Sequence, residues 1–171
     1  FGLYQPEEGI IKKDGQVVSI KDPNDANDLG IGMVHQHFKL VECFSVLDNI
    51  ILGVEPCRHG FLQKDVARKK VLALSEKYGL AVDPDALVED ITVGMQQRTE
   101  ILKMLYRDNE NLIFDEPTAL ITAQENDEPT QTLKHLDSLG KSILLIPHMP
   151  NQLLHPANRC SVRPRSKHSA T

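Results

Sequence analysis

The chain has 171 residues, of which 40% are hydrophobic and 25% are charged, as in one globular domain with a continuous core. Its net charge of −5 gives no reason to expect a nucleic-acid partner, and no apolar run has the length of a membrane span. Three cysteines without metal-ligand or CxxC spacing argue against a disulfide framework or a zinc site, and favour a reducing, intracellular compartment.

The first elements along the chain are short. Residues 9–20 alternate weakly around an Asp-Gly dipeptide, which is typical of two-residue hairpin turns, so a small hairpin is expected. Residues 22–28 are rich in Asp, Asn and Pro, which predicts either a loop or a short polar helix. Residues 30–34 then predict a short buried strand that ends just before Gln36.

The middle of the chain predicts helices. Ser45 is a plausible helix cap and is followed three residues later by Asp48, so a short helix is expected within residues 40–52. Residues 63–78 have helical periodicity and end at Gly79, a typical C-terminal cap. The buried stripe expected for this helix consists of Val66, Val71, Leu72, Leu74 and Tyr78.

A second strong helix is expected from Thr92 to Tyr106. One face of it is predicted to carry Met95, Thr99, Leu102 and either Leu105 or Tyr106.

The remaining part alternates strands with one helix. Leu112 to Phe114 predict a strand buried on both faces, and residues 142–146 predict another apolar strand. Between them, a helix is expected from a cap at Asn126 to about Leu139. Strands that alternate with helices indicate an α/β layer with a mostly parallel sheet. After His148 the sequence becomes basic and rich in proline, and we expect it to be largely disordered.

An acidic pair follows the strand at 112–114 directly. Burial and like charge both oppose ionisation of Asp115 and Glu116, and a bound cation would relieve that repulsion. Two adjacent carboxylates at a strand end suit a magnesium nucleotide site. They also suit a strand that simply ends in solvated acids, and the pair alone leaves both interpretations open.

Polar residues follow the other two strands as well. Gln36 comes after the first buried strand and His148 after the last, while Asp115 and Glu116 follow the strand between them. Ligands of open α/β sheets bind at the carboxyl ends of the strands. The sequence therefore predicts a polar functional cluster at that edge.

With these motifs in view, the chain closely resembles the nucleotide-binding subunits of ATP-binding-cassette (ABC) transporters. Residues 112–117 match the Walker B strand with its following Glu, Gln36 matches the Q-loop glutamine, and His148 matches the switch histidine. Residues 119–122 fall at the D-loop, and residues 91–98 resemble a divergent ABC signature. That signature and residues 33–41 are similar to the ATPases of nucleoside and simple-sugar importers.

The resemblance implies a fold and a division of the chain. The expected fold is α/β, a P-loop NTPase-like ABC ATPase domain with a mostly parallel sheet and an inserted helical subdomain at about residues 38–106. Residues 1–150 would form an incomplete nucleotide-binding domain, and residues 151–171 a poorly ordered basic tail.

The resemblance also implies roles for single residues. Asp115 would hold the magnesium shell, and Gln36 would link the metal and the water to the membrane partner. Glu116 would orient or deprotonate the attacking water, and His148 would bond the γ-phosphate region. In the signature, the residues expected to contact nucleotide on the opposite subunit are Thr92, Gly94 and Gln96.

Cofactors and partners follow from the same resemblance. ATP and Mg²⁺ are the implied cofactors. The implied partners are transmembrane permease subunits, a second nucleotide-binding domain (a homodimer or a tandem half) and, indirectly, a solute-binding protein; no nucleic acid is expected. Residues 38–60 would supply much of the surface that docks on the permease. The expected location is peripheral, at the cytoplasmic face of the cell membrane.

One motif of the family is missing. No GxxxxGK[ST] phosphate loop occurs in the 171 residues, although the family has it shortly before the position of Phe1. We therefore expect an N-terminally truncated domain that by itself binds ATP weakly or not at all. The leading hypothesis is an ATP-hydrolysing importer subunit at the level of the parent protein. The alternative is a catalytically inactive fragment or pseudo-domain that acts at most as an interaction surface.

Overall fold

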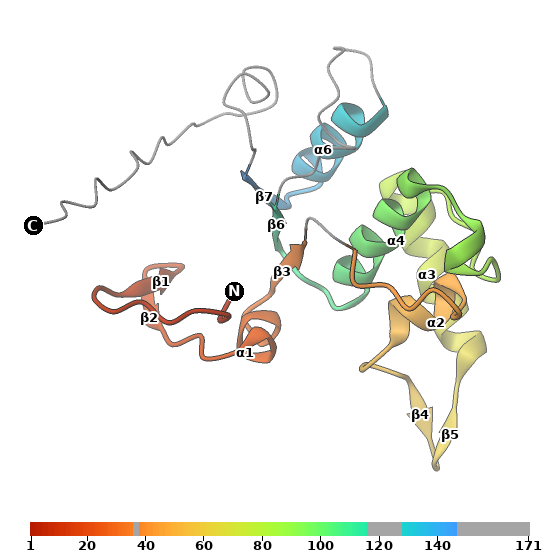
Figure 1. The fold of residues 1–171 in the computed structure, drawn as a ribbon, viewed down its shortest axis with the longest axis horizontal. Coiled ribbons are helices and arrows are strands. Elements are labelled where there is room, and N and C mark those ends of the chain that lie inside the picture. The colour runs from red at the N-terminus through yellow and green to blue at the C-terminus, as the bar shows by residue number, and fades with distance from the viewer. Residues whose placement is uncertain (36–37, 116–127, 147–171) are drawn as a thin grey trace, which may run out of the picture.

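The computed structural model describes residues 1–35, 38–115 and 128–146. Each helix and strand predicted within these ranges is present (Figure 1). In chain order, the elements are β1 (Ile11–Lys13), β2 (Gln16–Val18), α1 (Pro23–Asp28), β3 (Ile31–Val34), α2 (Val46–Ile51), β4 (Cys57–Arg58), β5 (Phe61–Leu62), α3 (Lys64–Tyr78), the 3-10 helix η1 (Val88–Asp90), α4 (Val93–Tyr106), β6 (Asn111–Asp115), α6 (Glu128–Ser138) and β7 (Ser142–Ile146).

Three of the strands form a parallel sheet in the order β3-β6-β7, which confirms the predicted α/β layer. The order requires crossovers, because β3 and β6 are neighbours although the helices α2 to α4 separate them in the chain. Figure 1 shows α2, α3 and α4 on one side of this sheet and the β1–β2 hairpin on the other.

One face of the sheet packs against the helices. Val34, Leu112 and Phe114 are buried there in the same cluster as residues of α2, α3, α4 and α6. Gly32 lies on this face, where a Cβ atom would stand 2.5 Å from Nδ2 of Asn109 and 2.8 Å from Sδ of Met104. A residue with a side chain would therefore force these two groups apart, so Gly32 permits close packing of α4 on β3.

The opposite face of the sheet is more open. Its apolar side chains include Ile113, which is half-buried, and Leu144 and Ile146, which are 55% and 43% exposed. The β1–β2 hairpin borders this face across an open cleft, to which it contributes Ile11 and Val18. The prediction that residues 112–114 are buried on both faces is therefore wrong among the described residues, because β6 alternates between buried and half-buried positions.

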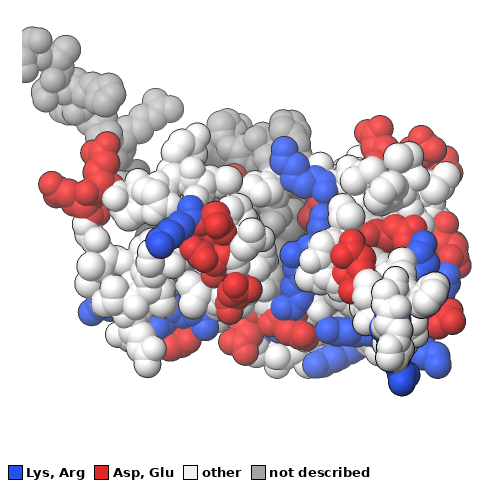
Figure 2. Space-filling view, turned by 90° about the horizontal axis from the view of Figure 1, so that it is seen from below, with Lys and Arg blue, Asp and Glu red and all other residues white. Residues whose placement is uncertain are grey.

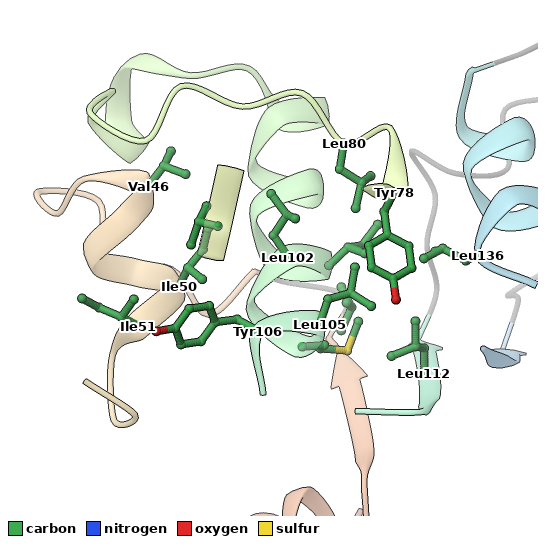
Figure 3. Packing of buried hydrophobic residues seen from close by; sticks show 14 of the residues in the cluster. Val46, Ile50, Ile51, Tyr78, Leu80, Leu102, Leu105, Tyr106, Leu112 and Leu136 are labelled. Carbon is green, nitrogen blue, oxygen red and sulfur yellow. The ribbon is translucent and has the colours of Figure 1, made fainter. Parts of the chain in front are cut away.

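A helical region, residues 38–106, contains α2, α3, η1, α4 and the β4–β5 hairpin. Ser45 caps α2, as predicted, whereas Thr92, which was expected to be the first residue of the next helix, caps α4. Figure 3 shows Val46 and Ile50 of α2 beside Leu102 of α4, with Leu105 nearer to Leu112 of the sheet. The predicted buried face of α4 is confirmed for Thr99, Leu102, Leu105 and Tyr106, while Met95 is half-buried.

The predicted stripe of α3 is partly wrong. Val71 and Tyr78 are buried, but Val66 and Leu72 are 58% and 44% exposed. The buried face instead runs through Ala67, Val71, Ser75 and Tyr78, which follow the helical repeat closely. Apolar character favoured Val66 and Leu72, whereas their angular position on the helix excludes them from that face. The Ser75 hydroxyl is satisfied because it donates to the carbonyl of Leu80 at 2.7 Å.

Two hairpins project from the described structure. The predicted turn of β1–β2 is confirmed, since Asp14 and Gly15 have φ of 52° and 80°. The β4–β5 hairpin was not predicted, because each strand has only two residues. Its turn has the same geometry, with φ of 51° at His59 and 81° at Gly60. Figure 1 shows this hairpin pointing away from the sheet.

The remaining predictions concern two helix ends and segments outside the described residues. Residues 23–28 form a helix rather than a loop, and Asp22 caps it. Gly140, with φ of 82°, follows α6. Asn126 and residues 151–171 lie outside the described residues, so the predicted cap and tail stay predictions. Among the described helices, none is long and apolar enough to cross a membrane.

Candidate functional site

The candidate site is built on the carboxyl ends of the three parallel strands. In the observed register, Val34 pairs with Phe114 and Phe114 with Leu145, while Asp115 pairs with Ile146. The strands β3, β6 and β7 therefore end at the same edge of the sheet, which is where α/β folds bind ligands. This edge is where the sequence predicts the polar cluster.

Only one of the four strand-end candidates belongs to the described structure. Gln36, Glu116 and His148 lie outside the described residues, so the structure does not test whether their side chains meet. In sequence, Glu116 directly follows Asp115, and Gln36 and His148 come two residues after the ends of β3 and β7. Their assembly into one cluster stays a prediction that the strand register supports.

Asp115 is the last residue of β6 and is half-buried. The alternation of the strand places Leu112 and Phe114 in the core and directs Asp115 away from it. Among the hydrogen bonds and ion pairs of the described residues, none involves its carboxylate. Its half-buried position at the end of β6, directed away from the core, suits an external cation or a water molecule.

A magnesium ion fits this donor set. Mg²⁺ usually binds through one or two carboxylates together with water and substrate phosphates, so it needs no all-protein cage. Within the described ranges, no group of three or more His, Cys, Asp or Glu side chains is arranged to hold a metal. Asp115 would therefore share the ion with a nucleotide and water.

The first turn of α4 is a second polar feature, and it lies apart from the sheet edge. Thr92 accepts a hydrogen bond from the Met95 N–H at 3.4 Å and so caps the helix. The N–H groups of Val93 and Gly94 have no acceptor within the helix, because they lie in its first turn. This turn carries no acidic side chain, so the 14-residue helix presents unopposed partial positive charge.

Gly94 has no evident structural role. A Cβ atom there would meet only Oγ1 of Thr92, at 4.0 Å, and the backbone is not in a conformation that requires glycine. Glycine inside a helix costs roughly 0.5–1 kcal/mol relative to alanine. A residue with this cost and no internal use is consistent with a surface that something outside this chain approaches closely.

Gln96, by contrast, has an internal contact. Its side-chain amide donates to the carbonyl of Val88 at 3.2 Å, which ties α4 to η1. The predicted contact of Gln96 with nucleotide stays a prediction, and this hydrogen bond adds a structural role. Figure 1 shows the N-terminal end of α4 on the side of the helical region away from β6. Within one chain, the structure therefore does not bring Thr92 and Gly94 to Asp115.

Glu100 of α4, a buried carboxylate that is 6% exposed, was not predicted from the sequence. Its Oε1 accepts a hydrogen bond from the Lys39 N–H at 3.0 Å, just after the segment that contains Gln36. The sequence did carry a signal that Glu100 is buried, because this residue lies between Thr99 and Ile101 on the broad buried face of α4. Its partner, 61 residues away, could not be read from the sequence.

The electrostatic features of the described surface lie mainly outside the candidate site. The Lys64 ammonium, 2.7 Å from Asp48, lowers the pKa of that carboxyl, and the Ser45 hydroxyl lowers it further. An ion pair with Arg68 likewise lowers the pKa of Asp85. Figure 2 shows acidic and basic side chains interspersed on the face that it displays.

Most of the chain matches a known protein family. The family model described as ABC transporter matches residues 1–119. The nucleoside import ATP-binding protein NupA of Lactococcus lactis is 51% identical over 166 residues, which cover 97% of this chain and 33% of that protein. The guanosine import ATP-binding protein NupO of Bacillus subtilis is 56% identical over 144 residues, 84% of this chain and 28% of that protein.

Sugar importers are also among the relatives. The ribose import ATP-binding protein RbsA 3 of Rubrobacter xylanophilus is 38% identical over 169 residues, 99% of this chain and 34% of that protein. The chain thus spans about a third of the length of these curated relatives.

Solved structures agree on the fold. The ATP-binding cassette MJ1267 superposes with a TM-score of 0.71 at 18% identity, over 91% of this chain and 65% of that one. The dimeric cassette MJ0796 bound to ADP and Pi gives a TM-score of 0.64 at 21% identity, over 88% and 67% of the two chains. At these identities the likeness establishes the fold alone.

Proposed function

This chain belongs to the ABC transporter family, and from that premise we propose that it is part of an ATP-binding and ATP-hydrolysing subunit of an importer for nucleosides or simple sugars. The observation that carries the proposal is that β3, β6 and β7 end at one edge of the sheet, with Asp115 at the end of β6. In the sequence, Gln36, Glu116 and His148 follow the ends of these three strands within two residues. Packing alone does not explain why polar residues follow the ends of all three parallel strands in the sequence.

The proposed chemistry divides between these residues. Asp115 would hold Mg²⁺, and bound Mg²⁺ would neutralise charge on the phosphates of ATP. Glu116 would orient or deprotonate the attacking water, His148 would bond the γ-phosphate region, and Gln36 would connect the metal and the water to the membrane partner. Positioned charges of this kind supply most of the catalysis in phosphoryl transfer.

A second copy would complete the site. The capped first turn of α4 offers free N–H groups, and helix N-termini bind phosphate readily. Because α4 begins away from β6, Thr92, Gly94 and Gln96 would contact a nucleotide held by the opposite subunit. Two nucleotide-binding domains, as a homodimer or as tandem halves, are therefore part of the proposal.

The permease would dock on part of residues 38–60. Most apolar side chains of α2 are committed to the chain's own core, among them Val46, Ile50 and Ile51 (Figure 3). Phe44, Leu52 and Val54 remain 39%, 37% and 40% exposed and are available to a partner. The assembled subunit would then sit peripherally on the cytoplasmic face of the membrane, with a solute-binding protein acting on the other side of the permease.

The proposal requires a phosphate loop from outside these 171 residues, since they contain no GxxxxGK[ST] motif. Reading the source gene upstream of the Phe1 codon is the simplest test. An in-frame GxxxxGK[ST] motif supports an ATPase, whereas a stop codon or frameshift between that motif and Phe1 contradicts it.

The biochemical test uses the whole protein that the gene encodes. Glu116→Gln should lower Mg²⁺-dependent ATP turnover at least about 100-fold, because general-base assistance is lost. Nucleotide affinity, measured by equilibrium binding of ATP, should stay unchanged. Glu76→Gln, at an exposed position of α3, is the matched control and should retain turnover. Full turnover in Glu116→Gln would remove this residue from the catalytic role.

A further inference from the structure

The segment that follows residues 36–37 is anchored by its side chains and by its backbone. Phe38 and Leu40 are partly buried and pack against the core cluster. The Lys39 side chain between them is exposed. At Lys39 the chain is therefore held through its backbone.

Two side chains of α4 hold that backbone. Oε1 of Glu100 accepts from the Lys39 N–H at 3.0 Å, and Nζ of Lys103 donates to the Lys39 carbonyl at 3.3 Å. Glu100 and Lys103 are three positions apart, so they share one face of the helix. Both hydrogen bonds involve a charged group, a class that is stronger than bonds between neutral groups.

The identity of residue 100 is informative because a buried carboxylate is costly unless it is hydrogen-bonded. Glu100 is itself only 6% exposed, so burial alone would favour an apolar side chain at this position. The hydrogen bond from the Lys39 N–H explains why a carboxylate, rather than an apolar side chain, occupies position 100.

Two residues further on, Val41 is held in a similar way by α2. The buried side chain of Asn49 accepts from the Val41 N–H at 2.7 Å and donates to the Val41 carbonyl at 3.0 Å. Residues 39 and 41 are thus attached by hydrogen bonds to two different helices of the helical region, α4 and α2.

We infer that Glu100, assisted by Lys103, is a positioning residue that couples the first turn of α4 to the segment leading back to Gln36. One rigid helix carries Thr92 and Gly94 at its start and Glu100 and Lys103 further along, so a shift of the helix displaces Lys39 with it. The inference rests on the proposed function, in which Gln36 serves the metal and the water.

The test compares variants of the whole protein that contains this chain. Glu100→Ala removes the acceptor, Lys103→Met removes the donor, and Glu100→Gln keeps an oxygen that can accept from the Lys39 N–H. Glu76→Ala, at an exposed position of α3, is the matched control. The measurements are kcat and KM for ATP, together with amide hydrogen exchange in a peptide covering residues 38–41.

Glu100→Ala should accelerate exchange in residues 38–41 and lower kcat about tenfold, the equivalent of about 1.4 kcal/mol. KM should change less than about twofold, because the segment orients the reacting groups rather than adding binding energy. Lys103→Met should shift exchange and kcat in the same direction by less, since its bond is longer and more exposed. Glu100→Gln should restore most of kcat, and Glu76→Ala should match the wild type.

Unchanged exchange in both Glu100→Ala and Lys103→Met would overturn the inference, as would a Glu100→Gln variant as impaired as Glu100→Ala. If Glu100→Ala does not fold, exchange and kcat are compared between Glu100→Gln and Lys103→Met. Values near the wild type in Glu100→Gln and altered values in Lys103→Met support the inference, and the absence of this difference overturns it. A wild-type protein that hydrolyses no ATP contradicts the proposed function instead, and the exchange data then decide separately whether the two side chains hold the segment.

Discussion

The two faces of the β3-β6-β7 sheet carry similar apolar residues but differ in burial. On the helix-packed face, Leu112 is 0% exposed, whereas on the opposite face Leu144 is 55% exposed. Both are leucines in neighbouring parallel strands, so their composition does not distinguish them. The difference shows that an apolar strand sequence predicts a side chain's capacity for burial, while the packing of other elements decides which side chains are buried.

Truncation on the covered face should have the largest effect. Leu112→Ala leaves a cavity among α4, α6 and the sheet, so the free energy of unfolding should fall by about 2.7–5 kcal/mol. Urea unfolding of the 171-residue chain, followed by circular dichroism, measures this change. A loss below about 1 kcal/mol would mean that the helix-packed face is not the core of this chain.

An ion pair between Asp48 of α2 and Lys64 of α3 joins two helices of the helical region, and its loss should have an intermediate effect on stability. Because Lys64 lowers the pKa of Asp48 in the folded state, the contact stabilises the fold above the usual carboxyl pKa of about 4. That stabilisation should disappear as pH falls from about 5 through the lowered folded pKa. Asp48→Asn should remove up to about 1 kcal/mol at neutral pH.

The measurement is the stability difference between the wild type and Asp48→Asn from pH 7 to pH 2. The difference should be constant near neutral pH and shrink in acid. A difference that grows in acid would mean that the carboxylate is not stabilised in the fold.

The smallest effect is expected on the open face. Leu144→Ala makes the same chemical change as Leu112→Ala, but more than half of the side chain is already in water. Its effect on unfolding should therefore stay within about 0.5 kcal/mol. Self-association, measured by light scattering, should also decrease because exposed apolar surface promotes it. A loss as large as that of Leu112→Ala would show that both faces are covered in solution.

Much of the fold was predictable because its signals are local. The cap at Ser45, the turn at Asp14 and Gly15, and the helical repeat of residues 64–78 depend on neighbours within about four residues. The parallel sheet followed from the alternation of strands and helices. The Asp115 position at the sheet edge followed from the same pattern.

Other features escaped prediction for physical reasons. Residues 66 and 72 are as apolar as residue 71, and only the packing of α3 selects among them. The β4–β5 hairpin has strands too short to show a period.

The sequence by itself therefore determined the elements, their caps and the family motifs, since hydrogen bonds and periodicity within a few residues specify them. The tertiary structure alone decided which face of the sheet is covered and that Glu100 holds Lys39. These contacts join residues far apart in the chain, and such pairings depend on how whole elements pack.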